Sequence, residues 1–264
     1  EPCGACVFEN LPIATILVSF VAVLFALSVH EAAHAAAAYW LEDDTARRLG
    51  RMTLNPVAHI DPIGTLILPL VGALANIPVI GWAKPVPVDP SNLTRRFRQR
   101  VGYAFVAAAG PLSNLIQSLI FLVALSLYIR FAFTLAGSDR FGLFLASLFL
   151  PVERFMGYGD LGAGQVLALT LLGRLVIINV GLALFNLIPA GPLDGGAILR
   201  GFLPWRWLPA WDRAQPFVGI ALLLGFWIPV PGTGMTLVSL ILWPFYTVAQ
   251  NLYLQPLARL LLGA

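Results

Sequence analysis

The feature that most constrains this chain is an apolar stretch over residues 11–41. A run of about 20 apolar residues is long enough to cross a bilayer as a helix. The only acidic, basic or histidine side chains in the stretch belong to His30, Glu31 and His34. Insertion scales assign about 2.5–3.5 kcal/mol to a charged side chain at the centre of such a helix. Polar groups in this place therefore indicate a functional site.

These three residues form the pattern H-E-x-x-H, which is typical of zinc sites. Residues four apart on a helix are offset by about 40°, so His30 and His34 project from one face and can share one ion. Glu31 lies about 100° around the axis from His30, where it reaches a water beside the ion more readily than the ion itself. The pattern predicts a zinc site with Glu31 as general base. A chance match, or two histidines that only pack within a helix bundle, are the alternatives.

The composition extends the membrane prediction to the whole chain. Of its 264 residues, 59% are hydrophobic and 11% are charged, which differs strongly from a soluble domain. Further apolar regions at residues 101–133, 164–188 and 216–255 are candidates for membrane helices. We expect an all-α polytopic membrane protein with about five to six transmembrane helices, folded as a single domain over residues 1–264. Its core occupies residues 12–205, and residues 216–255 form a C-terminal helical pair.

Arginine-rich loops constrain the topology and the choice of partners. The net charge of +3 comes mainly from these loops, so it indicates orientation in the membrane and predicts no nucleic-acid partner. Basic residues flank the apolar residues 63–81 on both sides, and a segment with two cytosolic flanks cannot cross the bilayer once. We therefore predict a re-entrant or β-hairpin element after the first core helix, with a plain transmembrane helix as the alternative. A related hypothesis is that residues 63–88 supply an edge strand that pairs with an extended peptide.

A catalytic zinc site needs a third protein ligand. The chain has three histidines, so His59 is the only histidine left for this role. The carboxylate candidates are Glu42, Asp43, Asp44, Asp61, Glu153, Asp160 and Asp194. The three at residues 42–44 continue the first helix outwards and are expected to face water. Cys3 and Cys6 form a lone C-x-x-C, which without further ligands is a weak metal or redox signal and is more typical of a flexible terminus.

Asp194 is the strongest carboxylate candidate. It follows a membrane helix that is broken by Pro189 and Pro192, and broken helices at membrane depth line cavities. Gly195 and Gly196 come directly after it and let the backbone approach another element closely. The alternative is that Asp194 caps the N-terminus of a following helix.

Several ordered motifs resemble those of one protein family. The H-E-x-x-H of the first core helix is paired with N-x-x-P-x-x-P-L-D-G-G at residues 186–196. Residues 54–65, 81–88 and 109–114 carry further motifs between them. Together they resemble the site-2 protease family of intramembrane zinc metalloproteases (peptidase family M50), in its compact prokaryotic branch without PDZ or CBS domains. The resemblance covers roughly residues 15–205.

The resemblance implies a catalytic centre and a setting for it. One Zn²⁺ per chain is held by His30, His34 and Asp194, and Glu31 is the catalytic base. The substrate is a transmembrane protein, cut in or near its membrane segment in regulated intramembrane proteolysis. The protein is then a multi-pass component of a lipid bilayer, the prokaryotic cytoplasmic (inner) membrane, with its active site toward the cytosolic side.

The resemblance also implies a second group of residues near the metal. Asn114 and Asn186 help to hold the substrate or the transition state, and we place His59 near the site as a loop residue. For Asn114 there is an alternative, because Gly110 lies on the same helix face and favours a close helix contact with a buried polar group.

Three other functions were weighed against this one. A membrane zinc protease that processes soluble or lipidated peptides would use a glutamate as third ligand, and no glutamate is well placed. A non-catalytic membrane scaffold would not need Glu31 beside the two histidines. An ion transporter would carry ionisable residues along several spans, but the later spans hold little besides Arg130 and Arg174.

Overall fold

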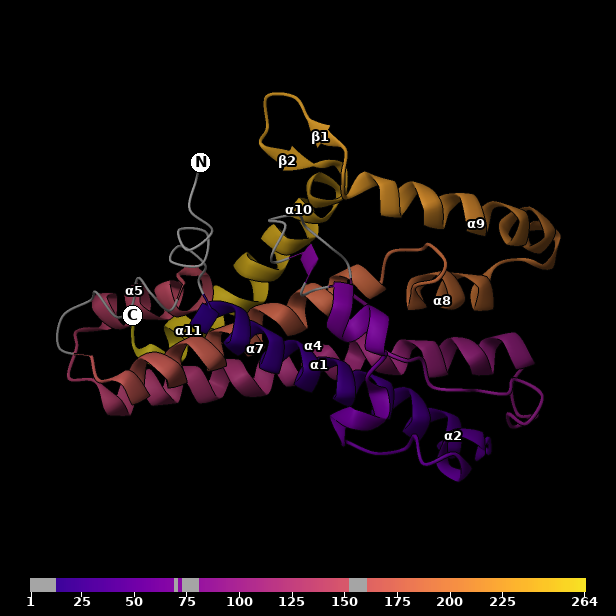
Figure 1. Ribbon diagram of the computed structural model, residues 1–264, viewed down its shortest axis with the longest axis horizontal. Coiled ribbons are helices and arrows are strands. Elements are labelled where there is room, and N and C mark those ends of the chain that lie inside the picture. Colours follow the sequence, from indigo (N-terminus) through magenta and orange to yellow (C-terminus); the bar gives the residue numbers. More distant parts are fainter. Residues whose placement is uncertain (1–12, 69–70, 73–80, 152–160) are drawn as a thin grey trace, which may run out of the picture.

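Long apolar helices dominate the computed structural model, which describes residues 13–68, 71–72, 81–151 and 161–264. Three of them lie side by side along the molecule (Figure 1): α1 (Ile13–Trp40), α4 (Gln99–Ala132) and α7 (Ala163–Asn186). Each lies within two residues of its predicted bounds, because apolar runs of this length leave little choice of helix ends.

Four helices in the described part of the chain are long and apolar enough to cross a membrane. They are α1, α4, α7 and the C-terminal helix over Leu237–Leu262, which joins α10 (Leu237–Ala249), the π-helical η4 (Gln250–Leu254) and α11 (Gln255–Leu262). The all-α polytopic architecture is confirmed. The described residues supply four such helices where we expected five to six, because α9 (Leu208–Gly225) carries Asp212 and Arg213 in its first half.

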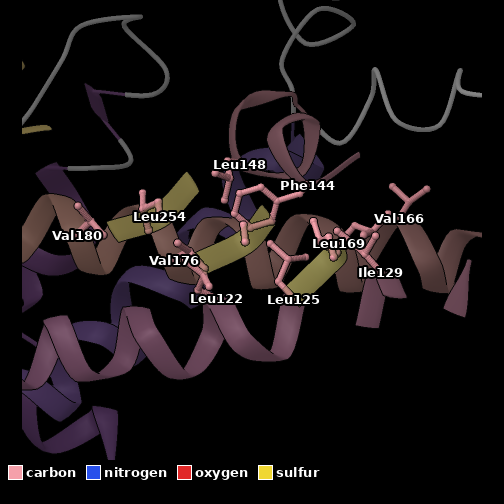
Figure 2. Packing of buried hydrophobic residues seen from close by; sticks show 12 residues of the cluster. Leu122, Leu125, Ile129, Phe144, Leu148, Val166, Leu169, Val176, Val180 and Leu254 are labelled. Atoms are coloured by element: carbon pink, nitrogen blue, oxygen red, sulfur yellow. The ribbon is translucent and has the colours of Figure 1, made fainter. Parts of the chain in front are cut away.

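The largest apolar cluster lies where α4 and α7 meet α5 (Gly137–Phe149), η4 and α11, as Figure 2 shows. Its fully buried members are Leu122, Leu125, Ile129, Phe144, Leu148, Val166, Leu169, Val176, Val180, Leu254, Ala258 and Leu262. In a bilayer, lipid tails are as apolar as these side chains, so close packing rather than the hydrophobic effect favours the contact. This end of the bundle is a closely packed apolar region.

The C-terminal part begins with α8 (Asp194–Phe202) and the short 3₁₀ helix η3 (Trp205–Trp207). Figure 1 shows α9 running beyond the main bundle to a two-stranded hairpin of β1 (Pro229–Val230) and β2 (Met235–Thr236). The predicted helical pair is present, but its first helix begins before Pro216. A proline in the first turn of α9 suits a helix start, and Pro216 is accommodated inside the helix.

The segment after α1 leaves the bundle and returns. It holds α2 (Thr45–Arg48), the 3₁₀ helix η1 (Pro56–His59) and the π-helix η2 (Pro62–Ile67). The N–H of Trp82 donates to the carbonyl of Gly64 at 3.3 Å, and the Thr65 hydroxyl donates to the carbonyl of Trp82 at 2.8 Å. The described ends of this segment, Gly64–Thr65 and Trp82, therefore lie side by side, and the re-entrant element between them stays a prediction. Part of the excursion (69–70 and 73–80) lies outside the described residues.

The returning chain is extended but does not form a β-ladder with any described residue. Residues 81–89 have no regular secondary structure, and the described strands are β1 and β2 alone. Pro85 and Pro87 lack backbone N–H groups, so the segment cannot supply the alternating donors of a ladder. The β-hairpin form of our prediction therefore has no counterpart in the described residues.

Candidate metal centre

Two histidines and one aspartate converge between α1 and α8. The Nε2 atoms of His30 and His34 lie 3.0 Å apart. The Oδ2 atom of Asp194 lies 3.2 Å from the first of these nitrogens, and its Oδ1 atom lies 3.4 Å from the second. All the donor atoms fall within 4.8 Å of one another, and both histidines are buried. The structure thus brings together the three side chains that the sequence predicted as ligands.

Helix α4 approaches the two histidines closely because it carries a glycine there. A Cβ atom at Gly110 would lie 2.4 Å from Nε2 of His34 and 2.6 Å from Cε1 of His30. Real Cβ contacts are never this short, so any other residue would displace the imidazoles. On the α1 side, the buried residues Ala26 and Ala35 keep the helix surface small.

The second ring nitrogen of each histidine is held by α4. Nδ1 of His30 lies 2.6 Å from Oδ1 of Asn114, and Nδ1 of His34 lies 2.8 Å from the carbonyl of Val106. Asn114 donates its own Nδ2 to Oδ1 of Asn179 at 2.8 Å, so its Oδ1 is the acceptor for His30. These acceptors favour the tautomer with the proton on Nδ1, in which Nε2 of each ring presents its lone pair to the centre.

This arrangement fits a cation. Two imidazole lone pairs and a carboxylate face one another over 3.0–3.4 Å, and three acceptors in a buried place repel one another unless a positive charge lies between them. The Oδ2 atom of Asp194 is buried and has no hydrogen-bond partner among the described residues. Nitrogen and carboxylate donors in this combination suit zinc.

Asp194 reaches the site because α8 folds back on the end of α7. A Cβ atom at Gly195 would lie 2.3 Å from the carbonyl oxygen of Ile188 and 2.4 Å from that of Leu187. Only glycine allows this approach. The N-cap of α8 is Leu193, and Asp194 is the first helical residue, so its carboxylate is not used as a helix cap.

Glu31 lies next to the ligand group without belonging to it. Its Oε2 atom accepts a hydrogen bond of 2.9 Å from the backbone N–H of Val86, in the extended segment that returns after residue 81. The side chain is partly buried. A carboxylate in this position can exchange protons with a water beside the site.

The sequence model of peptidase family M50 matches residues 18–226, which is most of the chain. A protein of Bacillus subtilis (strain 168) named "Putative zinc metalloprotease YwhC" is 31% identical over 241 residues, covering 90% of this chain and 87% of that protein. No solved structure matches the chain. The chain belongs to peptidase family M50. It is a membrane zinc metalloprotease of the site-2 protease family, with zinc as its metal.

The two asparagines that the sequence placed near the substrate of this M50 peptidase have different surroundings. Asn114 is fully buried behind His30, where it contacts the imidazole of His30 and has no exposure to a substrate cavity. Asn186 is the last residue of α7, is half-buried, and donates to the carbonyl of Leu182 in its own helix at 3.1 Å. The buried polar role weighed for Asn114 therefore describes its position here.

His59 lies outside the ligand group of the M50 peptidase. Its Nε2 atom lies 2.8 Å from the carbonyl of Thr53, and its ring is buried. Asp61 caps η2 by accepting from the N–H groups of Ile63 and Gly64. Asp43, expected to face water, is instead fully buried, because the chain turns back at Glu42, whose φ is 78°.

Asn179, the partner of Asn114, was not predicted from the sequence. Its side chain is fully buried in α7 and also donates to the carbonyl of Leu175 at 2.7 Å. An amide in the interior of the apolar stretch 164–188 was the available signal, because such a group needs a partner within the protein.

Proposed function

We propose that this M50 peptidase is an intramembrane endopeptidase that hydrolyses a peptide bond in or near a transmembrane segment of a membrane protein. The observation that carries the proposal is the convergence of His30 and His34, from a helix of membrane-spanning length, with Asp194 of α8, and with Glu31 beside them. At about 1.5 Å per residue, His34 lies about 9 Å along α1 from Trp40, its last residue. That depth supports a substrate bond at or below the membrane surface.

The side chains of the centre would have two roles, metal binding and proton transfer. His30, His34 and Asp194 would hold zinc, which supplies a Lewis acid that polarises the scissile carbonyl and acidifies water. Glu31 accepts a proton from the water that attacks the carbonyl carbon. It then donates that proton to the amine nitrogen as the C–N bond breaks and a carboxyl group remains on the other product. General acid–base catalysis of this kind contributes about 10²- to 10⁴-fold to the rate.

A helical substrate must unwind before it can react, because its carbonyls are hydrogen-bonded within the helix. Residues 81–89 lie extended beside Glu31, which supports the hypothesis that an extended substrate pairs with this segment. Its free donors are few, since Pro85 and Pro87 have none and the N–H of Val86 is already bonded. We infer that any such pairing relies mainly on backbone carbonyls of the segment.

The basic loops support an orientation for the site. Arg47, Arg48 and Arg51 follow the α1 end that is nearest to the metal centre, and four more arginines lie at residues 95–100. By the positive-inside rule we place this end of the bundle in the cytosol and the protein in a prokaryotic inner membrane.

A protease for soluble or lipidated peptides is the nearest rival. It would use a glutamate as third ligand, whereas the carboxylate that converges with the two histidines here is Asp194. The two functions also differ in substrate, because the rival would cleave a soluble peptide as readily as a membrane-inserted one.

The test uses purified wild type, Glu31→Gln and Asp194→Ala in lipid, with zinc content and cleavage of a transmembrane reporter measured together. We expect Glu31→Gln to keep zinc and lose at least about 100-fold in cleavage rate, since it cannot accept the proton. Asp194→Ala should lose zinc and cleavage. The matched substrate is a soluble peptide that carries the residues around the cleavage site but lacks the rest of the membrane segment. Full cleavage by Glu31→Gln, or equal cleavage of the soluble peptide, would contradict the proposal.

A further inference from the structure

Residues 81–94, called here the strap, contact Glu31 through one backbone group. The N–H of Val86 donates to Oε2 of Glu31 at 2.9 Å. Val86 lies between Pro85 and Pro87, so it carries the only N–H of residues 85–87. The single donor in this short stretch is therefore committed to the carboxylate next to the metal ligands.

A buried arginine holds the strap just before Val86. The Nη2 atom of Arg51 donates to the carbonyl of Lys84 at 2.6 Å and lies 3.4 Å from that of Pro85. The N–H of Lys84 donates to the carbonyl of His59 at 2.9 Å. Arg51 is only 8% exposed, and no acidic side chain among the described residues pairs with it, which is unusual for a buried arginine. Its guanidinium thus fixes the strap backbone within two residues of the Glu31 contact.

A second anchor lies beyond Val86. The N–H of Asp89 donates to Oδ2 of Asp43 at 2.8 Å, and the N–H of Thr94 donates to the carbonyl of Leu41 at 2.7 Å. Burial alone would raise the pKa of Asp43, but hydrogen bonds from Thr45, Asp89 and Asn92 outweigh it and hold that pKa below its ordinary value. Asp43 is therefore ionised at neutral pH and accepts strongly from the strap.

We propose that the strap positions the catalytic carboxylate, with Arg51 as the positioning residue that acts through Lys84, Pro85 and the N–H of Val86. The inference rests on the proposed role of Glu31 as base. One oxygen of Glu31 is fixed by the strap, which leaves the other to meet the attacking water. Without the strap the side chain is free to adopt other rotamers, and a displacement of about 1 Å in a catalytic group costs about 100-fold in rate.

The alternative is that the same contact inhibits the enzyme. If the hydrogen bond from Val86 kept Glu31 from accepting a proton, variants that weaken the strap would have a higher cleavage rate. Positioning predicts the reverse, so the sign of the change in kcat separates the two.

The first test compares Arg51→Gln, Arg51→Lys and Arg48→Gln in the zinc-loaded protein with a transmembrane reporter. Arg51→Gln should lower kcat by about 10- to 100-fold, change KM by less than about twofold, and leave zinc content unchanged, because substrate and metal contacts remain. Arg51→Lys can still donate to the Lys84 carbonyl and should restore part of kcat. Arg48 is the matched control, since its guanidinium is exposed and pairs with Asp44 at 2.7 Å.

The second test removes the N–H itself. Val86 precedes a proline, so its backbone is already restricted to the extended region that proline adopts. Proline at this position therefore keeps the backbone conformation and removes only the N–H that binds Glu31. Val86→Pro should lower kcat as Arg51→Gln does. Val88→Pro is the control, because no described residue accepts a hydrogen bond from the Val88 N–H.

A third readout does not depend on activity. Hydrogen–deuterium exchange of the Val86 amide, measured on zinc-free protein, should be slow in wild type and in Arg48→Gln. It should be at least about tenfold faster in Arg51→Gln and Glu31→Ala, which lose the anchor and the acceptor.

The outcomes separate this inference from the proposed function. Unchanged kcat in both Arg51→Gln and Val86→Pro, with Glu31→Gln inactive, would overturn the positioning role and leave the protease proposal intact. Increased kcat in either variant, or decreased kcat without faster Val86 exchange in Arg51→Gln, would also overturn it. If Arg51→Gln fails to fold, Val86→Pro and Arg51→Lys decide by the same criteria. An active Glu31→Gln would remove the proposed function itself.

Discussion

Helix α4 passes through two different environments. Around Leu122 and Ile129 it packs against α5, α7, η4 and α11 in a cluster of fully buried apolar side chains. At Val106, Gly110 and Asn114 it instead contacts the two histidines of the metal centre. We call these the apolar half and the metal half of the bundle. The first is held by many weak packing contacts, and the second by a few short, directional ones.

The difference follows from the solvent. In a bilayer, apolar side chains gain little by leaving lipid, so the apolar half depends on how closely its atoms fit. A polar group in the same solvent has no water to bind and needs a partner within the protein, as the chain from His30 through Asn114 to Asn179 provides. Small changes should therefore damage stability in the apolar half and metal geometry in the metal half.

The largest effect is expected from one methyl group in the metal half. Gly110→Ala places a Cβ atom 2.4 Å from Nε2 of His34, so the imidazoles must move and zinc content and cleavage should fall by at least about 100-fold. Gly181→Ala is the control, because nothing lies within 4 Å of a Cβ there. Zinc analysis and reporter cleavage measure both variants. Normal zinc content in Gly110→Ala would show that the centre tolerates displacement and would weaken the contrast between the halves.

A smaller effect is expected when the group that orients a ligand is removed. Asn114→Leu deprives Nδ1 of His30 of its acceptor, which should weaken zinc affinity by about 10- to 100-fold. Competition with a zinc chelator measures the affinity. If Asn114 instead held the substrate, the variant would keep its zinc affinity and raise KM, which would restore the role that the family resemblance implies.

The smallest effect on the metal is expected from the apolar half. Leu122→Ala leaves a cavity in a fully buried place and should lower the free energy of unfolding by about 1–3 kcal/mol, since the cavity term remains and little transfer free energy is lost to lipid. Leu127→Ala, on the same helix but 39% exposed, should change it by less than about 0.5 kcal/mol, because that side chain faces lipid in the folded and unfolded states. Unfolding in a denaturing detergent measures the difference. Both variants should bind one zinc per folded chain, and zinc loss in Leu122→Ala would show that the halves are coupled.

Sequence alone was sufficient where one physical signal dominates. The lengths of the apolar runs predicted α1, α4 and α7, and the rarity of charged groups in them indicated His30 and His34. Asp194 was predicted because prolines and glycines around it disrupt a membrane helix, and the structure places its carboxylate within 3.4 Å of both histidines.

Contacts between distant backbone segments could not be predicted in this way. The strap contacts Glu31 through a backbone N–H, and Arg51 holds it through carbonyls, so no side-chain pattern encodes either bond. The position of Asn114 depended on Asn179, 65 residues away, and on which face of α7 meets α4. Among the described residues, α9 is not one of the helices of spanning length and hydropathy, because charges in its first half reduce its hydropathy.

The central claim is that one zinc is bound by His30, His34 and Asp194 inside the membrane domain. Zinc K-edge X-ray absorption of the purified, active protein tests it most directly. The account predicts nitrogen and oxygen neighbours at about 2.0–2.2 Å, with the outer-shell signal of two imidazoles that falls to one in His34→Ala. Sulfur neighbours at about 2.3 Å, as binding at Cys3 and Cys6 would give, or an imidazole signal unchanged in His34→Ala, would contradict it.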